Sequence, residues 1–149
     1  MRLRSLNQLV AAGLLMPKAA DPERIARWVA QARRDLDVAD TVLFPVDRQR
    51  ALAVAYEAGF RACAAIVDLA GFRVTSQPGH HRAAIEAAGS VLGAEWLATL
   101  RQLDAARRRR NDLLYAEPAP VSTLEFRGLI LGAARLIDEA AARLERLTS

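Results

Sequence analysis

Cysteine, aromatic residues and long uncharged stretches are all scarce in this sequence. The single cysteine, Cys63, excludes an internal disulfide and lies in the apolar run 62–67, where we expect a small buried core residue. No stretch of 18 residues is free of charge, which excludes a membrane-spanning helix. Aromatic residues make up only 5% of the chain while alanine is abundant, so the composition excludes an all-β protein and favours helices.

The size and composition fit one folded unit. The chain has 149 residues, 52% of them hydrophobic and 26% charged, which is ordinary for a domain with a single core. Arginines precede the apolar stretch 9–16 as in a signal peptide, but Asn7 and Gln8 interrupt the hydrophobic region and Lys18 follows it. We therefore predict a single domain over residues 1–149, located in the cytoplasm and not associated with a membrane.

Proline, glycine and capping residues divide the chain into segments with helical periodicity. Asp21 before Pro22 is a helix start, Gly71 is a helix end, and Ser122 with Glu125 predicts a capping box. We expect a short helix within 4–15 and longer helices over 22–39, 47–70, 81–92, 94–115 and 122–147. We expect a loop over 72–79 and no sheet. The prediction is an all-α, up-down bundle of four to five helices with the short N-terminal helix packed against it.

The net charge comes from one local cluster. The chain has 21 basic and 17 acidic residues, and the five arginines and one aspartate of 101–110 account for the whole net charge of +4. Every basic residue except Lys18 is arginine, whose planar guanidinium suits phosphate and carboxylate groups. Arginine and alanine are also common in proteins from GC-rich genomes, so the composition alone identifies no partner.

The helix expected over 94–115 carries polar residues where its apolar stripe should continue. The stripe consists of Trp96, Leu100, Leu103 and Leu114. Its middle is occupied by Arg107, Arg110 and Asn111, whereas Arg108 and Arg109 point elsewhere and should be exposed. Polar groups at buried positions need hydrogen-bonding partners, a cleft or a binding partner.

Two interpretations of these arginines are open. They could pair with carboxylates such as Asp104, Asp112 or Glu117 and close the end of the helix. Alternatively, Arg107, Arg110 and Asn111 could form an anion site, above all for phosphate.

The sequence Arg-Asn-Asp-Leu-Leu-Tyr at 110–115, after an arginine-rich helix in a bundle of this size, resembles the HEPN superfamily. Members of that family are four-to-five-helix bundles, commonly dimeric, and often toxin components or encoded beside a small nucleotidyltransferase. Many are metal-independent ribonucleases whose motif is arginine, a polar residue, a spacer and histidine. The resemblance implies that Arg110 takes the place of the family arginine, Asn111 that of the polar residue and Tyr115 that of the histidine.

The resemblance implies a homodimer in which two copies of the motif face one cleft that binds RNA or another phosphate ligand. If this chain cleaved RNA, Arg110 and Tyr115 would be its catalytic residues. A phenol is a poor base at neutral pH, however, so we expect phosphate binding without cleavage. The alternative function is a non-catalytic interaction module for a nucleotidyltransferase, another protein or a nucleotide.

The two histidines do not form a metal site by themselves. His80 and His81 are adjacent, so they point in different directions, and no further ligand has the three- or four-residue spacing of a zinc site. No phosphate-binding glycine loop and no aromatic platform for stacking bases is apparent, so we expect neither a metal nor a cofactor. His81 could replace the missing base if the fold brought it near Arg110, which the sequence leaves open.

Overall fold

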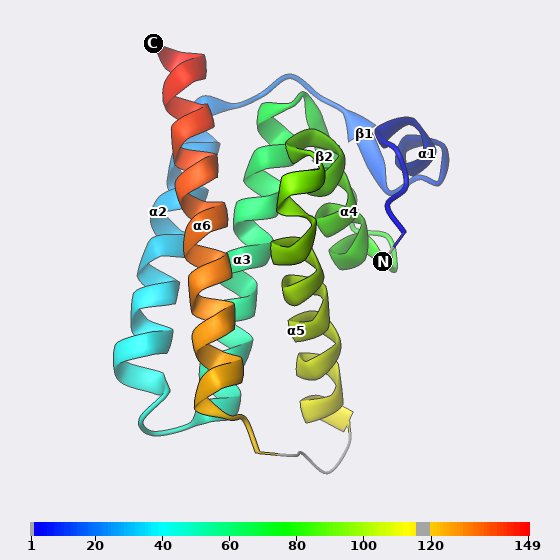
Figure 1. Ribbon diagram of the computed structural model, residues 1–149. Helices are drawn as coiled ribbons and strands as arrows, with labels where there is room; N and C mark the ends of the chain where they lie inside the picture. Colours follow the sequence, from blue (N-terminus) through cyan, green and yellow to red (C-terminus); the bar gives the residue numbers. More distant parts are fainter. Residues whose placement is uncertain (1, 116–119) are drawn as a thin grey trace.

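The computed structural model describes residues 2–115 and 120–149, with the backbone alone at Leu114 and Tyr115. Its α-helices are α1 (Leu6–Ala11), α2 (Pro22–Val38), α3 (Arg48–Leu69), α4 (His80–Leu92), α5 (Leu97–Tyr115) and α6 (Thr123–Thr148). The helices α2, α3 and α6 pack together, and α4 and α5 pack on another side of α3 (Figure 1). The four longest helices, α2, α3, α5 and α6, alternate in direction. The shorter α4 runs in the same direction as α3: His81 at its start stacks on Phe60, and Val91 near its end lines a pocket with Leu69. The predicted all-α bundle is confirmed, with the up-down alternation in its four longest helices.

Helix α3 is the centre of the core. Its buried residues run from Ala51 to Asp68 and include the fully buried Tyr56, as expected for a helix that is apolar almost all round. Cys63 is buried, as predicted, and this burial raises the pKa of its thiol to about 12. The thiol is therefore an inert part of the core.

The helix starts lie where capping residues predict them. The carboxylate of Asp21 accepts a hydrogen bond from the Arg24 backbone N–H at 3.2 Å, and the Ser122 hydroxyl accepts one from the Glu125 N–H at 3.0 Å. In a complete capping box the Glu125 side chain would also accept from the backbone N–H of Ser122. Here the Glu125 carboxylate accepts from Arg109 Nε at 2.8 Å instead.

Two short strands contradict the prediction that there is no sheet. Strand β1 (Leu15–Pro17) pairs antiparallel with β2 (Phe72–Val74), where the sequence predicted the end of a helix and a loop. Three residues are too few for strand alternation to be recognised, and the pairing joins segments far apart in the chain.

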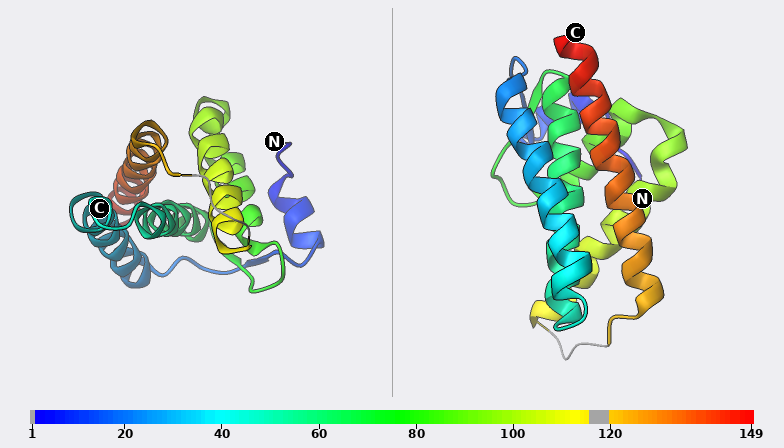
Figure 2. Two further views of the ribbon diagram at one scale, coloured as in Figure 1. Left: turned by 90° about the horizontal axis from the view of Figure 1, so that it is seen from below. Right: turned by 90° about the vertical axis from the view of Figure 1, so that its left-hand side faces the viewer.

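Figure 2 shows that the N-terminal segment lies beside the α4–α5 hairpin, away from α6.

Two glycines at close helix contacts should respond oppositely to alanine. A Cβ on Gly59 would lie 2.7 Å from Leu103 Cδ1 in the core, whereas one on Gly128 would meet the amide end of the exposed Gln102, which can move. We expect Gly59→Ala to destabilise the fold by about 1 kcal/mol, because overpacking outweighs the gain in helix propensity. Gly128→Ala should stabilise it by about 0.5 kcal/mol. Urea unfolding compares them, and equal stabilities would contradict this difference.

Candidate anion-binding site

The start of α4 and the second half of α5 meet around a cavity of about 250 Å³. Its functional side chains are His80, His81, Arg82, Arg107, Arg110 and Asn111. The residues of α4 and those of α5 meet because the two helices form an antiparallel hairpin. His81 on α4 and Arg107 on α5 lie about equally far from its turn at Gly93. The question left open by the sequence is thereby answered: His81 and Arg110 line the same cavity.

Arg107 and Arg110 are half-buried, and each is held by a carboxylate. Arg107 Nε donates to Asp104 Oδ1 at 2.9 Å, and Arg110 Nη2 lies 3.0 Å from Glu57 Oε1 on α3. The ion-pair interpretation is thus confirmed for Asp104, while Glu57 was not predicted. A guanidinium carries five N–H donors, so both arginines keep donors that these carboxylates do not use.

Of the other predicted partners, Glu117 lies outside the described residues. Asp112 is exposed near the end of α5, and within the described ranges it forms no ion pair with these arginines.

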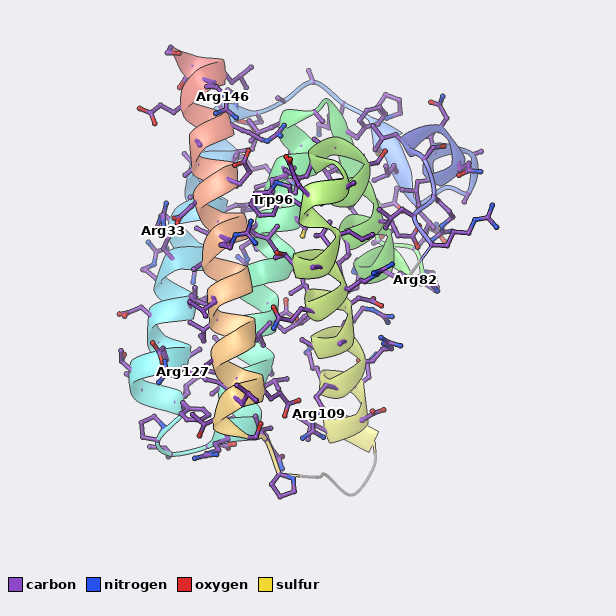
Figure 3. All side chains as sticks on the ribbon, in the orientation of Figure 1. Arg33, Arg82, Trp96, Arg109, Arg127 and Arg146 are labelled. Carbon is purple, nitrogen blue, oxygen red and sulfur yellow. The ribbon has the colours of Figure 1, made fainter. Side chains whose placement is uncertain are left out.

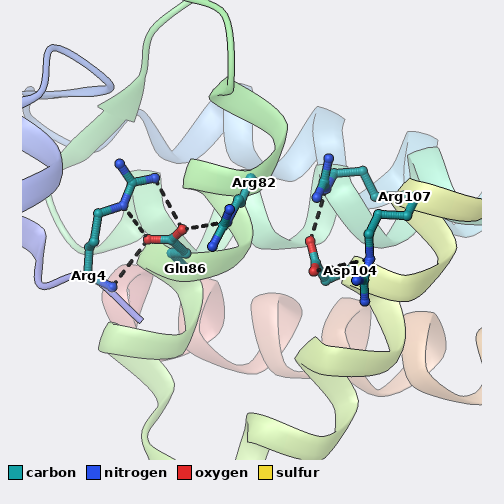
Figure 4. Close-up of polar contacts among 6 residues, drawn as sticks. Arg4, Arg82, Glu86, Asp104 and Arg107 are labelled. Carbon is teal, nitrogen blue, oxygen red and sulfur yellow. Dashed lines mark hydrogen bonds and ion pairs between the residues drawn. The ribbon is translucent and has the colours of Figure 1, made fainter. Parts of the chain in front are cut away.

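Arginines outnumber carboxylates around the cavity. Glu86 is shared by Arg4 and Arg82, and Asp104 by Arg107 and Arg108, as Figure 4 shows for these two neighbouring clusters. With the pair between Glu57 and Arg110, three carboxylates face five arginines. The region therefore keeps a positive charge that favours an anion.

His81 is held by aromatic contacts at the cavity wall. Its Nδ1 lies 2.8 Å from Tyr56 Oη, and its ring stacks on Phe60 with centroids 4.1 Å apart. Burial, together with the charges of His80, Arg110 and Arg107, lowers the pKa of His81 to about 4. The imidazole is therefore neutral at neutral pH.

The contact with Tyr56 determines which nitrogen of His81 carries the proton. Burial raises the pKa of Tyr56, so its phenol stays protonated, and His81 Nδ1 is its only hydrogen-bond partner among the described residues. Tyr56 is fully buried, so its phenol proton would have no acceptor unless it were donated to Nδ1. We therefore assign the phenol as the donor and place the proton of neutral His81 on Nε2. The free ring nitrogen is consequently a hydrogen-bond donor.

Two predictions about the arginine-rich helix are wrong. The apolar stripe predicted a buried position for Asn111, but its side chain is exposed. It lines the open cavity and is not covered by a core residue. Arg109 is half-buried, because the chain returns after α5 and brings Glu125 and the Pro120 carbonyl within hydrogen-bonding distance. Figure 3 shows Arg109 between the end of α5 and the start of α6. Arg108 is exposed, as predicted.

Tyr115 is the last residue of α5, and its side chain lies outside the described part of the structure. Its assignment as a catalytic residue stays a prediction. Sequence reasoning gave no role at this site to Arg82, Tyr56 or Glu57. The hairpin geometry could have revealed Arg82, since residues equally far from Gly93 face each other across the hairpin. The sequence gives no comparable signal for the two residues of α3.

Within the described ranges, no three His, Cys, Asp or Glu side chains are grouped closely enough to hold a metal ion. No helix in the same ranges combines the length and apolar character needed to cross a membrane. No protein-family model, curated protein or solved structure matches the chain. The chemistry of the cavity is therefore the basis for a function.

Proposed function

We propose that this protein binds the phosphate backbone of RNA at the cavity between α4 and α5. The observation that carries the proposal is geometric: the half-buried Arg107 and Arg110 and the ring of His81 line one cavity. Charge-assisted hydrogen bonds from arginine are the strongest protein contacts to phosphate oxygens. The start of α4 supports the same ligand, because its first turn contains no acidic residue and no side chain caps it.

The protonation of His81 favours binding over cleavage. Cleavage of RNA without a metal requires a base that removes a proton from the attacking 2′-hydroxyl. In neutral His81, Nδ1 already accepts a hydrogen bond from Tyr56 and Nε2 carries the proton, so no lone pair faces the phosphate. We therefore propose an HEPN-like component that binds RNA and leaves it intact. The homodimer implied by the resemblance remains a prediction that sedimentation of the protein with and without RNA can test.

The variant Arg110→Ala should bind RNA about 10–30-fold more weakly than the unaltered protein, because one charge-assisted contact to phosphate is lost. Fluorescence anisotropy with a labelled single-stranded RNA at about 50 mM salt measures the affinity. The control is Arg101→Ala, which removes an equal charge from an exposed position of α5 away from the cavity. We expect this control to bind almost as well as the unaltered protein, and electrophoresis should show uncut RNA.

Two results would contradict the proposal. One is the absence of RNA binding by the unaltered protein at low salt. The other is equal affinity of Arg110→Ala and Arg101→Ala, which would mean that only the overall charge matters. Circular dichroism of each variant shows whether a loss of binding reflects a loss of fold, since Arg110→Ala leaves Glu57 without its partner.

A further inference from the structure

A second cavity, of about 370 Å³, shares His80 with the anion site. It lies among the first turns of α2, the outer face of α3 and the segment from β2 to α4. Three rings, those of Trp28, Phe60 and His80, contribute to its wall. These rings come from three separate segments, which explains why the sequence shows no aromatic platform.

The charged groups of this cavity favour a ligand that is both flat and anionic. Three arginines line it, Arg24, Arg61 and Arg73, against the single carboxylate of Asp68. The guanidinium carbon of Arg24 lies 4.2 Å from the centre of the Trp28 ring, so a cation already lies over an aromatic ring in this cavity. Bases of nucleic acids stack on such rings and guanidinium planes, while their phosphates pair with arginine.

Asp68 and Arg73 are left with unused hydrogen-bonding capacity. The Asp68 side chain is 2% exposed, and neither of its oxygens accepts a hydrogen bond of ordinary geometry from the described residues. Arg73 Nη2 lies 3.9 Å from Asp68 Oδ2, and the buried Arg73 Nε has no acceptor in the same ranges. Burial raises the pKa of Asp68, which the charges of Arg24 and Arg73 and the nearby backbone N–H of Asp21 oppose. Unsatisfied buried groups of this kind are rare in folded proteins.

We propose that this second cavity binds a guanine base, selected by Asp68, in the nucleotide whose phosphate occupies the anion site. Guanine presents two adjacent N–H donors, which match the two oxygens of a carboxylate, next to a carbonyl oxygen that can accept from Arg73 Nε. Adenine, cytosine and uracil each lack one part of this pattern. Among the described residues, the guanidinium of Arg73 has no polar side-chain contact shorter than the one at 3.9 Å, so the proposal requires it to turn as the base enters and uncover Asp68.

This inference rests on the proposed function, and calorimetric titration with mononucleotides tests it. GMP should bind about 10-fold more tightly than AMP, CMP or UMP, because a bidentate pair discriminates between bases by about that factor. Inorganic phosphate should bind more weakly than any of the four. Asp68→Asn should lower the affinity for GMP to that for AMP. The control is Asp37→Asn, an equal charge change at an exposed position of α2 that should preserve the preference.

A second variant leaves Asp68 in place. Ser76 lies at the exposed rim of the cavity, and Ser76→Trp should fill it and abolish the preference for GMP while the protein stays folded. Equal affinity for GMP and AMP in the unaltered protein would overturn the inference. If Arg110→Ala still weakened both nucleotides in that case, the anion site would stand. If neither the nucleotides nor phosphate bound, the proposed function would fail as well.

Discussion

Replacement of Arg4 by methionine is expected to lower the free energy of unfolding by about 2–4 kcal/mol, because it removes two side-chain donors from a buried carboxylate. The side chain of its partner Glu86 is only 1% exposed. Arg4 supplies this carboxylate with three donors: its backbone N–H at 3.2 Å, Nε at 2.7 Å and Nη2 at 3.1 Å. The substitution removes the two side-chain donors, so among the described residues the buried carboxylate keeps the backbone N–H of residue 4 and Arg82, whose Nε lies 3.0 Å away.

Urea unfolding followed by circular dichroism measures this effect against two further variants. Arg33→Met removes an arginine from an exposed pair with Asp138 on the outer face of α2 (Figure 3), and should cost less than about 1 kcal/mol. Changing Arg4 and Glu86 together to methionine should recover at least half of the loss, because no buried charge then remains. Equal stabilities of Arg4→Met and Arg33→Met would contradict the assignment.

The pair between Arg4 and Glu86 also shows which parts of the fold the sequence could not predict. Helix starts such as Asp21 and Ser122 were predictable because a cap and its partner lie within one turn. The strands β1 and β2 and the pair between Arg4 and Glu86 join segments far apart in the chain. Their short sequences contain no periodic signal of such contacts.

The candidate site divides in the same way. Arg107 and Arg110 were predictable because they interrupt an apolar stripe, a pattern that lies within a single helix. The contacts of Tyr56 with His81 and of Glu57 with Arg110 depend on how α3 packs against the α4–α5 hairpin. These contacts determine the proton position on His81, so the chemistry of the site required the tertiary structure.

Acid should destabilise the protein through His81 by about 1–3 kcal/mol, after allowance for the part of the ring that solvent reaches. The pKa of His81 is about 4 in the folded protein, below the ordinary 6.5. Between these values the unfolded chain binds more protons, so this contribution to stability is fully present above pH 6.5 and is lost as the pH falls towards 4. Urea unfolding at several pH values measures it.

The difference between the unaltered protein and His81→Gln isolates this contribution. The variant loses the contact with Tyr56 at every pH, but the part of its stability that depends on pH between 4 and 6.5 should shrink. The raised pKa of Asp68 has the opposite effect on stability. The folded protein binds this proton more readily than the unfolded chain does, so acid stabilises the fold through Asp68. Both proteins contain Asp68, so its effect cancels in the comparison. An unchanged pH dependence in His81→Gln would show that His81 is not the group that titrates.

The same titration also reports on the anion site. A phosphate bound beside Arg107, Arg110 and His81 would favour the charged imidazole, so phosphate should raise the pKa of His81. Proton NMR of the His81 ring measures its titration midpoint with and without phosphate. A midpoint that does not move, under conditions in which Arg110→Ala weakens phosphate binding, would place the anion away from His81.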